Sequence, residues 1–185
     1  MISKLILTRP KKTNIISSLI MLVEKTNFSH CGWLHETVVY ESIAHGCVAT
    51  DSEQFLKKNK IVLSISIKDM FKDITAAEIN KALRYANDNL GTRYGFLTLF
   101  FGIPLNKLFG TTFFSDGAKS MICSEFFCRI FEKRFRRIFN KPLDMVTPME
   151  LGKKFKLIKK SIIRLIEGKT CRGVHKANGL YRLND

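Results

Sequence analysis

The sequence predicts an α+β fold in which an antiparallel sheet packs against helices, within one domain that spans residues 1–185. Segments rich in β-branched residues, some of them alternating apolar and polar side chains, occupy much of the chain before residue 70. Helix-capping patterns and apolar residues at helical spacing dominate after residue 73. A chain of 185 residues can bury a sizeable core, and no repeat or linker divides it.

Five short segments are predicted to be strands, and β-branched residues are most numerous in 37–42 and 61–67. These segments are residues 3–8, 27–34, 37–42, 47–50 and 61–67. The second and third of them form an antiparallel hairpin that turns near His35-Glu36. Before that hairpin, Thr13 or Asn14 can cap a helix. The apolar residues that form one face of this helix are Ile15, Ile16, Leu19, Ile20 and Val23.

Two predicted helices have clear boundaries. Thr75 and Glu78 form a capping box for a helix that ends at Gly91. A long amphipathic helix is expected from Cys123 to Asn140, because apolar residues at helical spacing oppose basic ones along it. Its buried stripe is predicted to contain Phe127, Ile130, Phe131, Phe135 and Ile138. The phenylalanine-rich run before it, which includes Phe96, Phe100, Phe101, Phe113 and Phe114, is interpreted as core rather than as a substrate groove.

The C-terminal part contains a second capping box, in which Thr147 precedes Pro148 and Glu150. Residues 155–166 are predicted to be strand-like with a basic exposed edge. Residues 152–185 as a whole are therefore interpreted as a basic C-terminal extension of the sheet, or a tail.

The formal charge of +15 is the most unusual compositional feature. Its basic residues concentrate late in the chain: Arg129, Lys133, Arg134, Arg136, Arg137, Lys141, Lys153, Lys154, Lys156, Lys159 and Lys160. Such a surface attracts anionic partners, which include nucleic acid, anionic lipid headgroups and anionic wall polymers. The alternative is a solvated basic face that only aids solubility.

The cysteines and the apolar runs predict the compartment. Five cysteines without a CxxC pair fit neither a zinc ribbon nor a secreted disulfide framework, so most are expected to be buried free thiols. No metal or cofactor is predicted. No apolar run approaches the roughly 20 residues of a membrane span, and no signal-peptide cleavage site follows residues 15–23. We expect a cytoplasmic or virion-associated protein without a transmembrane segment or signal peptide.

Cys123 is the candidate nucleophile, because it begins the predicted amphipathic helix. Free N–H groups and the dipole at a helix N-terminus stabilise a thiolate and lower its pKa. The same N–H groups can hold the oxyanion that forms when a thiolate attacks a carbonyl. By position alone, a small buried hydrophobic residue at the start of the helix is the favoured explanation of Cys123.

His30 is the candidate base, since it lies inside a predicted strand where imidazole is unusual. His35, His45 and His175 fall in a predicted turn, a loop and the polar tail, so they are expected to be solvated. Glu41 lies on the returning strand of the hairpin, where its carboxylate can orient the imidazole. A core histidine and a solvent-facing glutamate are the structural alternatives.

Five segments in this order resemble the circularly permuted branch of the NlpC-type papain-like cysteine hydrolase superfamily, which includes YiiX-like proteins and relatives of lecithin retinol acyltransferase. The segments are Phe28-Ser29-His30-Cys31-Gly32-Trp33, Val39-Tyr40-Glu41-Ser42, Tyr94-Gly95-Phe96, Ile122-Cys123-Ser124-Glu125-Phe126 and Pro148-Met149-Glu150-Leu151. The resemblance covers roughly residues 5–151. It departs from the family pattern at Gly95, where an acidic residue is usual, and at Ser42, where alanine is.

The resemblance implies a circularly permuted papain-like fold, in which a small barrel-like antiparallel sheet packs against helices and the nucleophile begins a helix. It implies Cys123 as nucleophile, His30 as base and Glu41 as orienting group, with Tyr94 and Ser124 at the substrate cleft. A buried structural role for Tyr94 is the alternative. Glu125 is expected to cap or pair near the helix start.

The implied reaction is hydrolysis of a peptide or other amide, with lipid-ester acyl transfer as the less favoured form. The alternative is a non-catalytic structural or binding protein of a virion or nucleoprotein complex, whose basic surface holds nucleic acid or anionic lipid.

Overall fold

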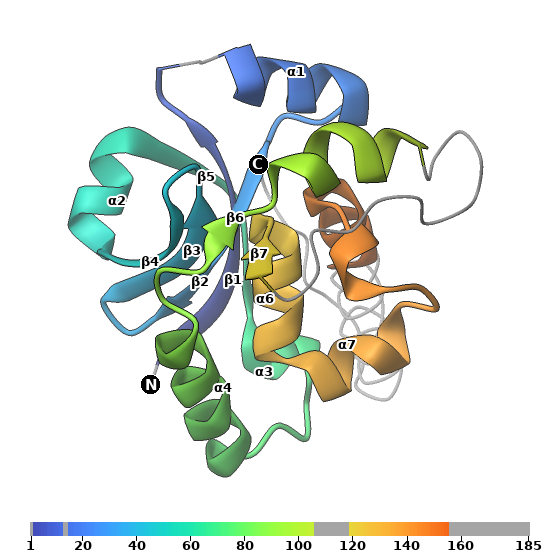
Figure 1. Cartoon of the computed structure of the whole chain (residues 1–185). Coiled ribbons are helices and arrows are strands. Elements are labelled where there is room, and N and C mark those ends of the chain that lie inside the picture. Colours follow the sequence, from blue (N-terminus) through green and yellow to red (C-terminus); the bar gives the residue numbers. More distant parts are fainter. Residues whose placement is uncertain (1, 13–14, 106–118, 156–185) are drawn as a thin grey trace, which may run out of the picture.

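The computed structural model describes residues 2–12, 15–105 and 119–155, and within them it is a mixed α+β structure (Figure 1). Its main sheet has five antiparallel strands in the order β4-β3-β2-β1-β5. The strands are β1 (Ser3–Pro10), β2 (His30–His35), β3 (Val38–Ile43), β4 (Gly46–Asp51) and β5 (Asn59–Ser66). The α+β class and the antiparallel sheet are confirmed. The sheet is open, so the expected barrel-like closure is absent from the described residues.

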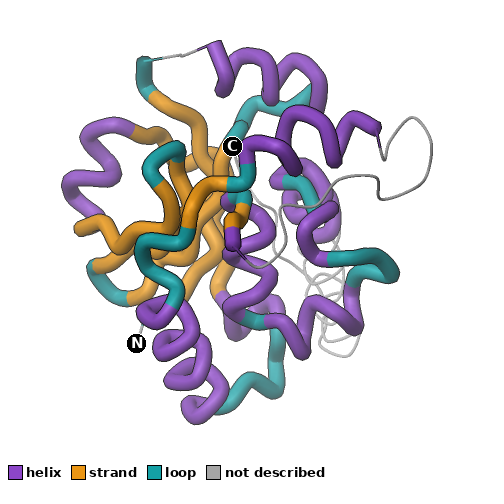
Figure 2. The backbone as a smooth tube through the Cα atoms, in the orientation of Figure 1, coloured by secondary structure: helices purple, strands orange, loops and turns teal. Residues whose placement is uncertain are grey.

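The helices cover both faces of this sheet and one end of it, as the tube in Figure 2 shows. They are α1 (Ile15–Glu24), α2 (Ser52–Lys58), α3 (Ile67–Met70), α4 (Ala76–Asp88), α6 (Cys123–Ile130) and α7 (Glu132–Ile138). A helical run over residues 96–105 contains the π-helical segment η1 (Thr98–Gly102), η3 (Leu143–Met145) is a 3₁₀ turn, and residues 148–155 form a last helix. No helix in the described ranges is long and apolar enough to cross a membrane.

Several sequence predictions lie outside the described residues. They are the cap at Thr13 or Asn14, the core role of Phe113 and Phe114, the strand-like character of 156–166 and the remainder of the 152–185 extension, with its Cys171 and His175. The expected core role is wrong for Phe96, Phe100 and Phe101, because their side chains are exposed.

Both predicted capping boxes are present. The Thr75 side chain accepts from the N–H of Glu78, and the Glu78 carboxylate accepts from the N–H of Thr75. Thr147 and Glu150 make the same reciprocal pair at the start of the last helix. Each pair satisfies two N–H groups that a helix start otherwise leaves without partners.

The prediction of one long helix over residues 123–140 is wrong, because the chain breaks at Phe131 into α6 and α7. Phe131 leaves the helical conformation, with φ −118° and ψ 38°. Its ring is buried and packs edge-on against Trp33, with the ring centroids 5.3 Å apart. Aromatic packing therefore sets this break, since neither glycine nor proline is present between Cys123 and Ile138.

The main hydrophobic core lies between the sheet and the helices α4, α6 and α7. Trp33 of β2, Phe127 of α6 and Phe135 of α7 are fully buried there. A smaller cluster on the opposite face joins Ile6 and Val39 to Phe55 of α2. Burial of large side chains on both faces fixes the register of the strands, because a slip of one residue would exchange the two faces.

The β2–β3 hairpin turns where the sequence predicted, with Glu36 in the left-handed region at φ 53°. Gly32 pairs with Glu41 in this register, and a Cβ at position 32 would lie 3.1 Å from Val39. Beyond this pair the two strands separate, and the Ser42 hydroxyl donates to the carbonyl of Met121 in the short strand β7 (Ser120–Met121). This contact brings the segment that leads into α6 to the open end of the hairpin.

Candidate active site

Cys123 is the first residue of α6, and its side chain is almost fully buried. The N-cap residue, Ile122, provides no side-chain cap for the helix. Glu125 bonds back to the backbone of Ile122 and pairs with Arg129, with 2.7 Å between Oε1 and Nε. Glu125 therefore caps and pairs near the helix start, as expected. Because the N-cap side chain makes no hydrogen bond to the first turn of α6, N–H groups of that turn can donate to an anion.

The thiol of Cys123 contacts two residues from the start of β2. The Cys31 thiol and the Cys31 backbone both hydrogen-bond to it, and the His30 side chain does so as well. The Cys31 hydrogen bond and the charge of His30 hold the pKa of Cys123 well below its usual value, against the opposing effect of burial. Burial and the neighbouring thiolate raise the pKa of Cys31 well above its usual value. Of this pair, Cys123 ionises, because the imidazole bonds to it and the start of α6 stabilises its charge.

His30 connects this thiol to a carboxylate. Its Nε2 lies 2.7 Å from Oε2 of Glu41, so Nδ1 is the nitrogen left for the thiol. Burial lowers the pKa of His30, but the charge and hydrogen bond of Cys123, together with Glu41, outweigh burial and raise this pKa to about 10. The geometry matches an imidazolium that is held between a thiolate and a carboxylate.

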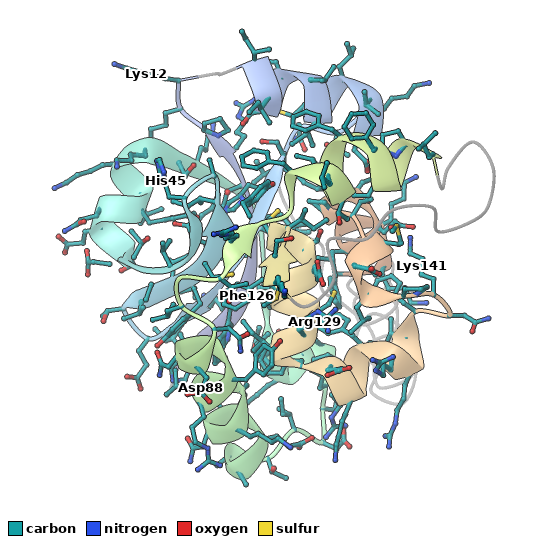
Figure 3. All side chains as sticks on the ribbon, viewed as in Figure 1. Lys12, His45, Asp88, Phe126, Arg129 and Lys141 are labelled. Atoms are coloured by element: carbon teal, nitrogen blue, oxygen red, sulfur yellow. The ribbon has the colours of Figure 1, made fainter. Side chains whose placement is uncertain are left out.

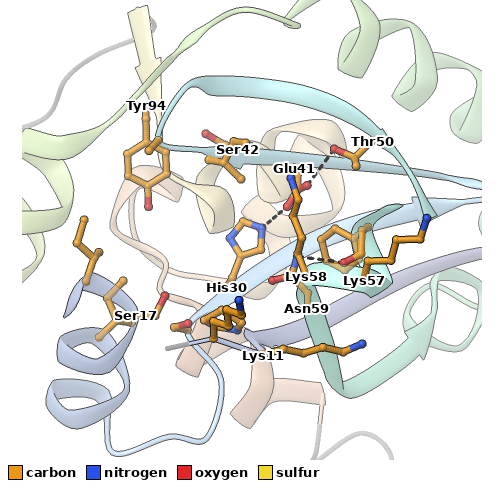
Figure 4. Close-up of a pocket in the computed structure, with 18 of the residues that line it drawn as sticks. Lys11, Ser17, His30, Glu41, Ser42, Thr50, Lys57, Lys58, Asn59 and Tyr94 are labelled. Carbon is orange, nitrogen blue, oxygen red and sulfur yellow. Dashed lines mark hydrogen bonds and ion pairs between the residues drawn. The ribbon is translucent and has the colours of Figure 1, made fainter. Parts of the chain in front are cut away.

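Glu41 is itself held in place by Thr50 of β4. The Thr50 hydroxyl donates to Oε1 of Glu41 at 3.1 Å, while Oε2 faces His30 (Figure 4). Glu41 is buried, so these two contacts fix the orientation of its carboxylate. The resulting chain of contacts runs from Thr50 through Glu41 and His30 to Cys123.

A pocket of about 730 Å³ opens beside this chain of contacts. His30, Glu41 and Tyr94 line it, together with Lys11, Lys12, Lys57 and Lys58 at its rim (Figure 4). Cys123 is not among the lining residues, although the thiolate raises the pKa of Tyr94 further than burial alone does. The thiol therefore lies close behind the His30 and Tyr94 side chains.

The sequence-predicted site residues are brought together with one exception. His30, Glu41 and Tyr94 line this pocket, and Cys123 contacts His30 behind the lining residues. Ser124 is fully buried, does not line the pocket, and its hydroxyl has no hydrogen-bond partner. Its backbone N–H, in the first turn of α6, is the part of Ser124 that lies at the candidate oxyanion position.

Two other buried cysteines, Cys47 and Cys128, do not have the lowered thiol pKa of Cys123. Burial raises the pKa of Cys47 to about 11 and that of Cys128 well above its usual value. His35 was expected to be solvated, but its ring is half-buried against Trp33, with centroids 5.0 Å apart. Among the described residues, no group of three histidine, cysteine, aspartate or glutamate side chains could hold a metal ion.

The basic residues of α6 and α7 are largely paired with carboxylates. Arg134 makes ion pairs with Asp73 at 2.7 Å and with Glu78 at 2.9 Å. Three further pairs join Arg129 to Glu125, Arg136 to Glu132 and Lys141 to Glu150. Neutralised in this way, these helices present less positive charge than the sequence indicates.

Sequence reasoning missed Cys31, Thr50 and Ser42. Cys31 follows His30 directly, but its contact with Cys123 depends on how α6 docks on the sheet. Thr50 was placed in a strand without a register, and Ser42 was seen only as a departure from a pattern. No family model, curated protein or solved structure matched the chain in comparisons with known proteins.

Replacing Cys31 with alanine is expected to raise the pKa of Cys123, because the mutation removes the hydrogen bond that contributes most to lowering it. The rate of alkylation by iodoacetamide, followed against pH by intact-protein mass spectrometry, should show an acid limb shifted to higher pH. Cys47→Ala is the matched control, since Cys47 is an equally buried thiol that does not contribute to the Cys123 pKa. An unshifted limb in Cys31→Ala, or an equal shift in the control, would contradict the assignment.

Proposed function

We propose that the protein is a thiol-dependent hydrolase, a peptidase or amidase rather than a lipid acyltransferase, with Cys123 as nucleophile and His30 as base. The observation that supports this most is the position of the His30 imidazole, which contacts the Cys123 thiol while Glu41 occupies its Nε2 at 2.7 Å. Acyl transfer through a thioester needs an activated thiolate, a proton donor beside it and N–H groups that can stabilise an oxyanion.

The reaction would begin with attack of the Cys123 thiolate on the carbonyl carbon of an amide or ester. The carbonyl π electrons move to oxygen, and the N–H groups at the start of α6 stabilise the oxyanion. As the carbon–nitrogen or carbon–oxygen bond breaks, the His30 imidazolium transfers its proton to the leaving group. A thioester at Cys123 remains.

Hydrolysis of that thioester uses the same residues in reverse. Neutral His30 takes a proton from water as the water oxygen attacks the thioester carbonyl. The carbon–sulfur bond then breaks, and the thiolate and imidazolium are restored with release of a carboxylic acid. Glu41 keeps the imidazole in one orientation throughout, and Thr50 keeps Glu41 in place.

A circularly permuted papain-like fold is the arrangement that we propose for this chemistry. In support of it, the histidine comes from β2, which precedes the cysteine helix α6 in the chain. The antiparallel sheet packs its core face against that helix. Tyr94 lies at the pocket, as the resemblance implies for a cleft residue.

The proposal is tested by asking whether Cys123 forms an acyl-enzyme. We expect incubation with p-nitrophenyl acetate to add one acetyl group to the protein and release p-nitrophenolate. Peptide mapping should place the acetyl group on Cys123, and hydroxylamine should remove it, because thioesters react with this nucleophile. Acetylation of lysines alone, with Cys123 unmodified, would refute the proposed function.

The second candidate function is a non-catalytic binding module, and it can be judged from how many of the basic side chains are paired with carboxylates. It relied on the basic residues of α6 and α7, of which Arg129, Arg134 and Arg136 are paired with carboxylates, as is Lys141 after α7. Paired charges attract a polyanion less strongly than free ones. The described helices therefore favour the hydrolase over a nucleic-acid-binding module that uses this surface.

A further inference from the structure

We propose that the surface formed by α1 and the helical run 96–105 is a docking face for an anionic phospholipid bilayer. The proposal does not depend on the hydrolase activity, because it rests on the exposed apolar side chains of these helices and on nearby lysines, and not on Cys123 or His30. Its apolar part consists of Ile15, Ile16, Leu19, Leu22, Val23, Phe96, Leu97, Phe100 and Phe101. These residues are called the docking face below.

The apolar side chains of the docking face are exposed to a degree that a solvated surface does not explain. Among the described residues, nine of the twelve exposed large hydrophobic side chains belong to it. Ile15 is 87% exposed and Leu22 is 73% exposed. The only buried residue of α1 is Glu24, so the helix points its hydrophobic side chains outward rather than into the core. Such a concentration marks an interaction surface.

The two helices form one continuous surface. They lie side by side at one end of the molecule (Figure 1), and an apolar groove between them is lined by Leu19, Val23, Leu99 and Phe100. Phe96 and Phe100 stack with their rings nearly parallel and their centroids 6.3 Å apart. An amphipathic surface of aromatic and aliphatic side chains is suited to the boundary between headgroups and acyl chains.

The charges that border the docking face identify the kind of partner. Lys11 and Lys12 precede α1, Lys25 follows it, and Lys12 extends outward beside it in Figure 3. Lys57 and Lys58 at the end of α2 lie across the pocket from α1. In residues 2–12 and 15–25 the only carboxylate is that of Glu24, which is buried. Lysines at both ends of an apolar helix match an anionic lipid surface.

A second copy of the chain fits this surface less well. A two-fold contact through α1 would bring the lysines of one copy close to those of the other, and like charges at an interface are repulsive. A bilayer with anionic headgroups instead pairs these lysines while it buries the apolar side chains. Charge complementarity therefore favours the membrane.

Docking would also orient the candidate active site. Ile16 and Ile20 of α1 and Phe96 of the neighbouring helix line the pocket that contains His30 and Glu41. The mouth of this pocket thus adjoins the docking face. A bilayer bound at the docking face would therefore lie next to the mouth of the pocket.

The test is sedimentation of the full-length protein with vesicles. We expect binding to vesicles of phosphatidylcholine mixed with phosphatidylglycerol, and weaker binding to phosphatidylcholine alone. The double variant Leu22→Asp/Phe101→Asp should weaken binding at least about tenfold. Lys11→Gln/Lys12→Gln should weaken it by about tenfold or more, and only with the anionic vesicles, since each lysine near a charged bilayer contributes about 1 kcal/mol. Cys123→Ala should bind as the wild type does.

Matched controls separate the docking face from general charge and hydrophobicity. Leu90→Asp changes an exposed leucine just after α4, and Lys68→Gln/Lys72→Gln removes two lysines around α3. Both should bind vesicles normally. Unchanged sedimentation of Leu22→Asp/Phe101→Asp would overturn the proposal, because binding would then come from elsewhere. No vesicle binding by the wild type, or a dimer in sedimentation velocity that this variant dissociates, would overturn it as well.

Discussion

Cys123→Ala is expected to abolish turnover of any ester or amide substrate, with a loss of at least about 10⁴-fold, because no other group can form the thioester. Hydrolysis of p-nitrophenyl acetate and of a fluorogenic peptide library would measure this. The fold should survive, since alanine removes one buried sulfur from the first position of α6 and introduces no new contact. Thermal unfolding by circular dichroism would establish that the variant is folded.

The control for Cys123→Ala is Cys128→Ala, which removes another buried sulfur from the same helix. Burial raises the pKa of Cys128, so this thiol is protonated and unreactive at neutral pH. Cys128→Ala should keep most of the activity despite a comparable loss of packing. Equal activity losses in the two variants would mean that α6 contributes only structurally, and the nucleophile assignment would fail.

His30→Gln is expected to have the second largest effect, because His30 both stabilises the thiolate and supplies the proton for the leaving group. Removal of the imidazolium raises the pKa of Cys123, so alkylation at about pH 6 should slow by about tenfold or more. Turnover should fall further than alkylation does, since alkylation needs only the thiolate. Both rates can be measured on the same protein.

Turnover is expected to rise and then to fall as the pH increases. At low pH the thiol of Cys123 is protonated, and activity rises as the thiolate forms at the lowered pKa. Activity should fall again near pH 10, where His30 loses its proton and the leaving group has no donor. These limbs belong to the coupled pair rather than to either residue alone. In His30→Gln the alkaline limb should disappear, and its persistence there would exclude His30 as the proton donor.

The sequence predicted the hairpin well, because its second strand is rich in β-branched residues and His35-Glu36 separates it from the first. This prediction was enough to place Glu41 near His30, where their 2.7 Å contact is found. Helix α2 was missed although its signals are present. Asp51 accepts from the N–H groups of Glu53 and Gln54, and two lysines end the helix.

Other features could not be predicted from local sequence. The break at Phe131 depends on Trp33, which is far away in the chain. The contact of Cys31 with Cys123 depends on the docking of α6 at the open end of the hairpin. Likewise the exposure of α1 is not visible in its composition, because an apolar helix in a sequence of this size is ordinarily interpreted as core.

The separation of β2 from β3 beyond Gly32 and Glu41 has a consequence for the order in which the protein becomes active. All five strands of the main sheet lie within residues 3–66, so this sheet can assemble from neighbouring segments while the chain is still being synthesised. The proposed nucleophile is the first residue of α6, which begins at residue 123 and must pack on the sheet afterwards. The pKa of the Cys123 thiol is therefore lowered only after α6 has packed against the sheet. Nascent or truncated chains that contain His30 and Glu41 but lack Cys123 are therefore expected to be inactive.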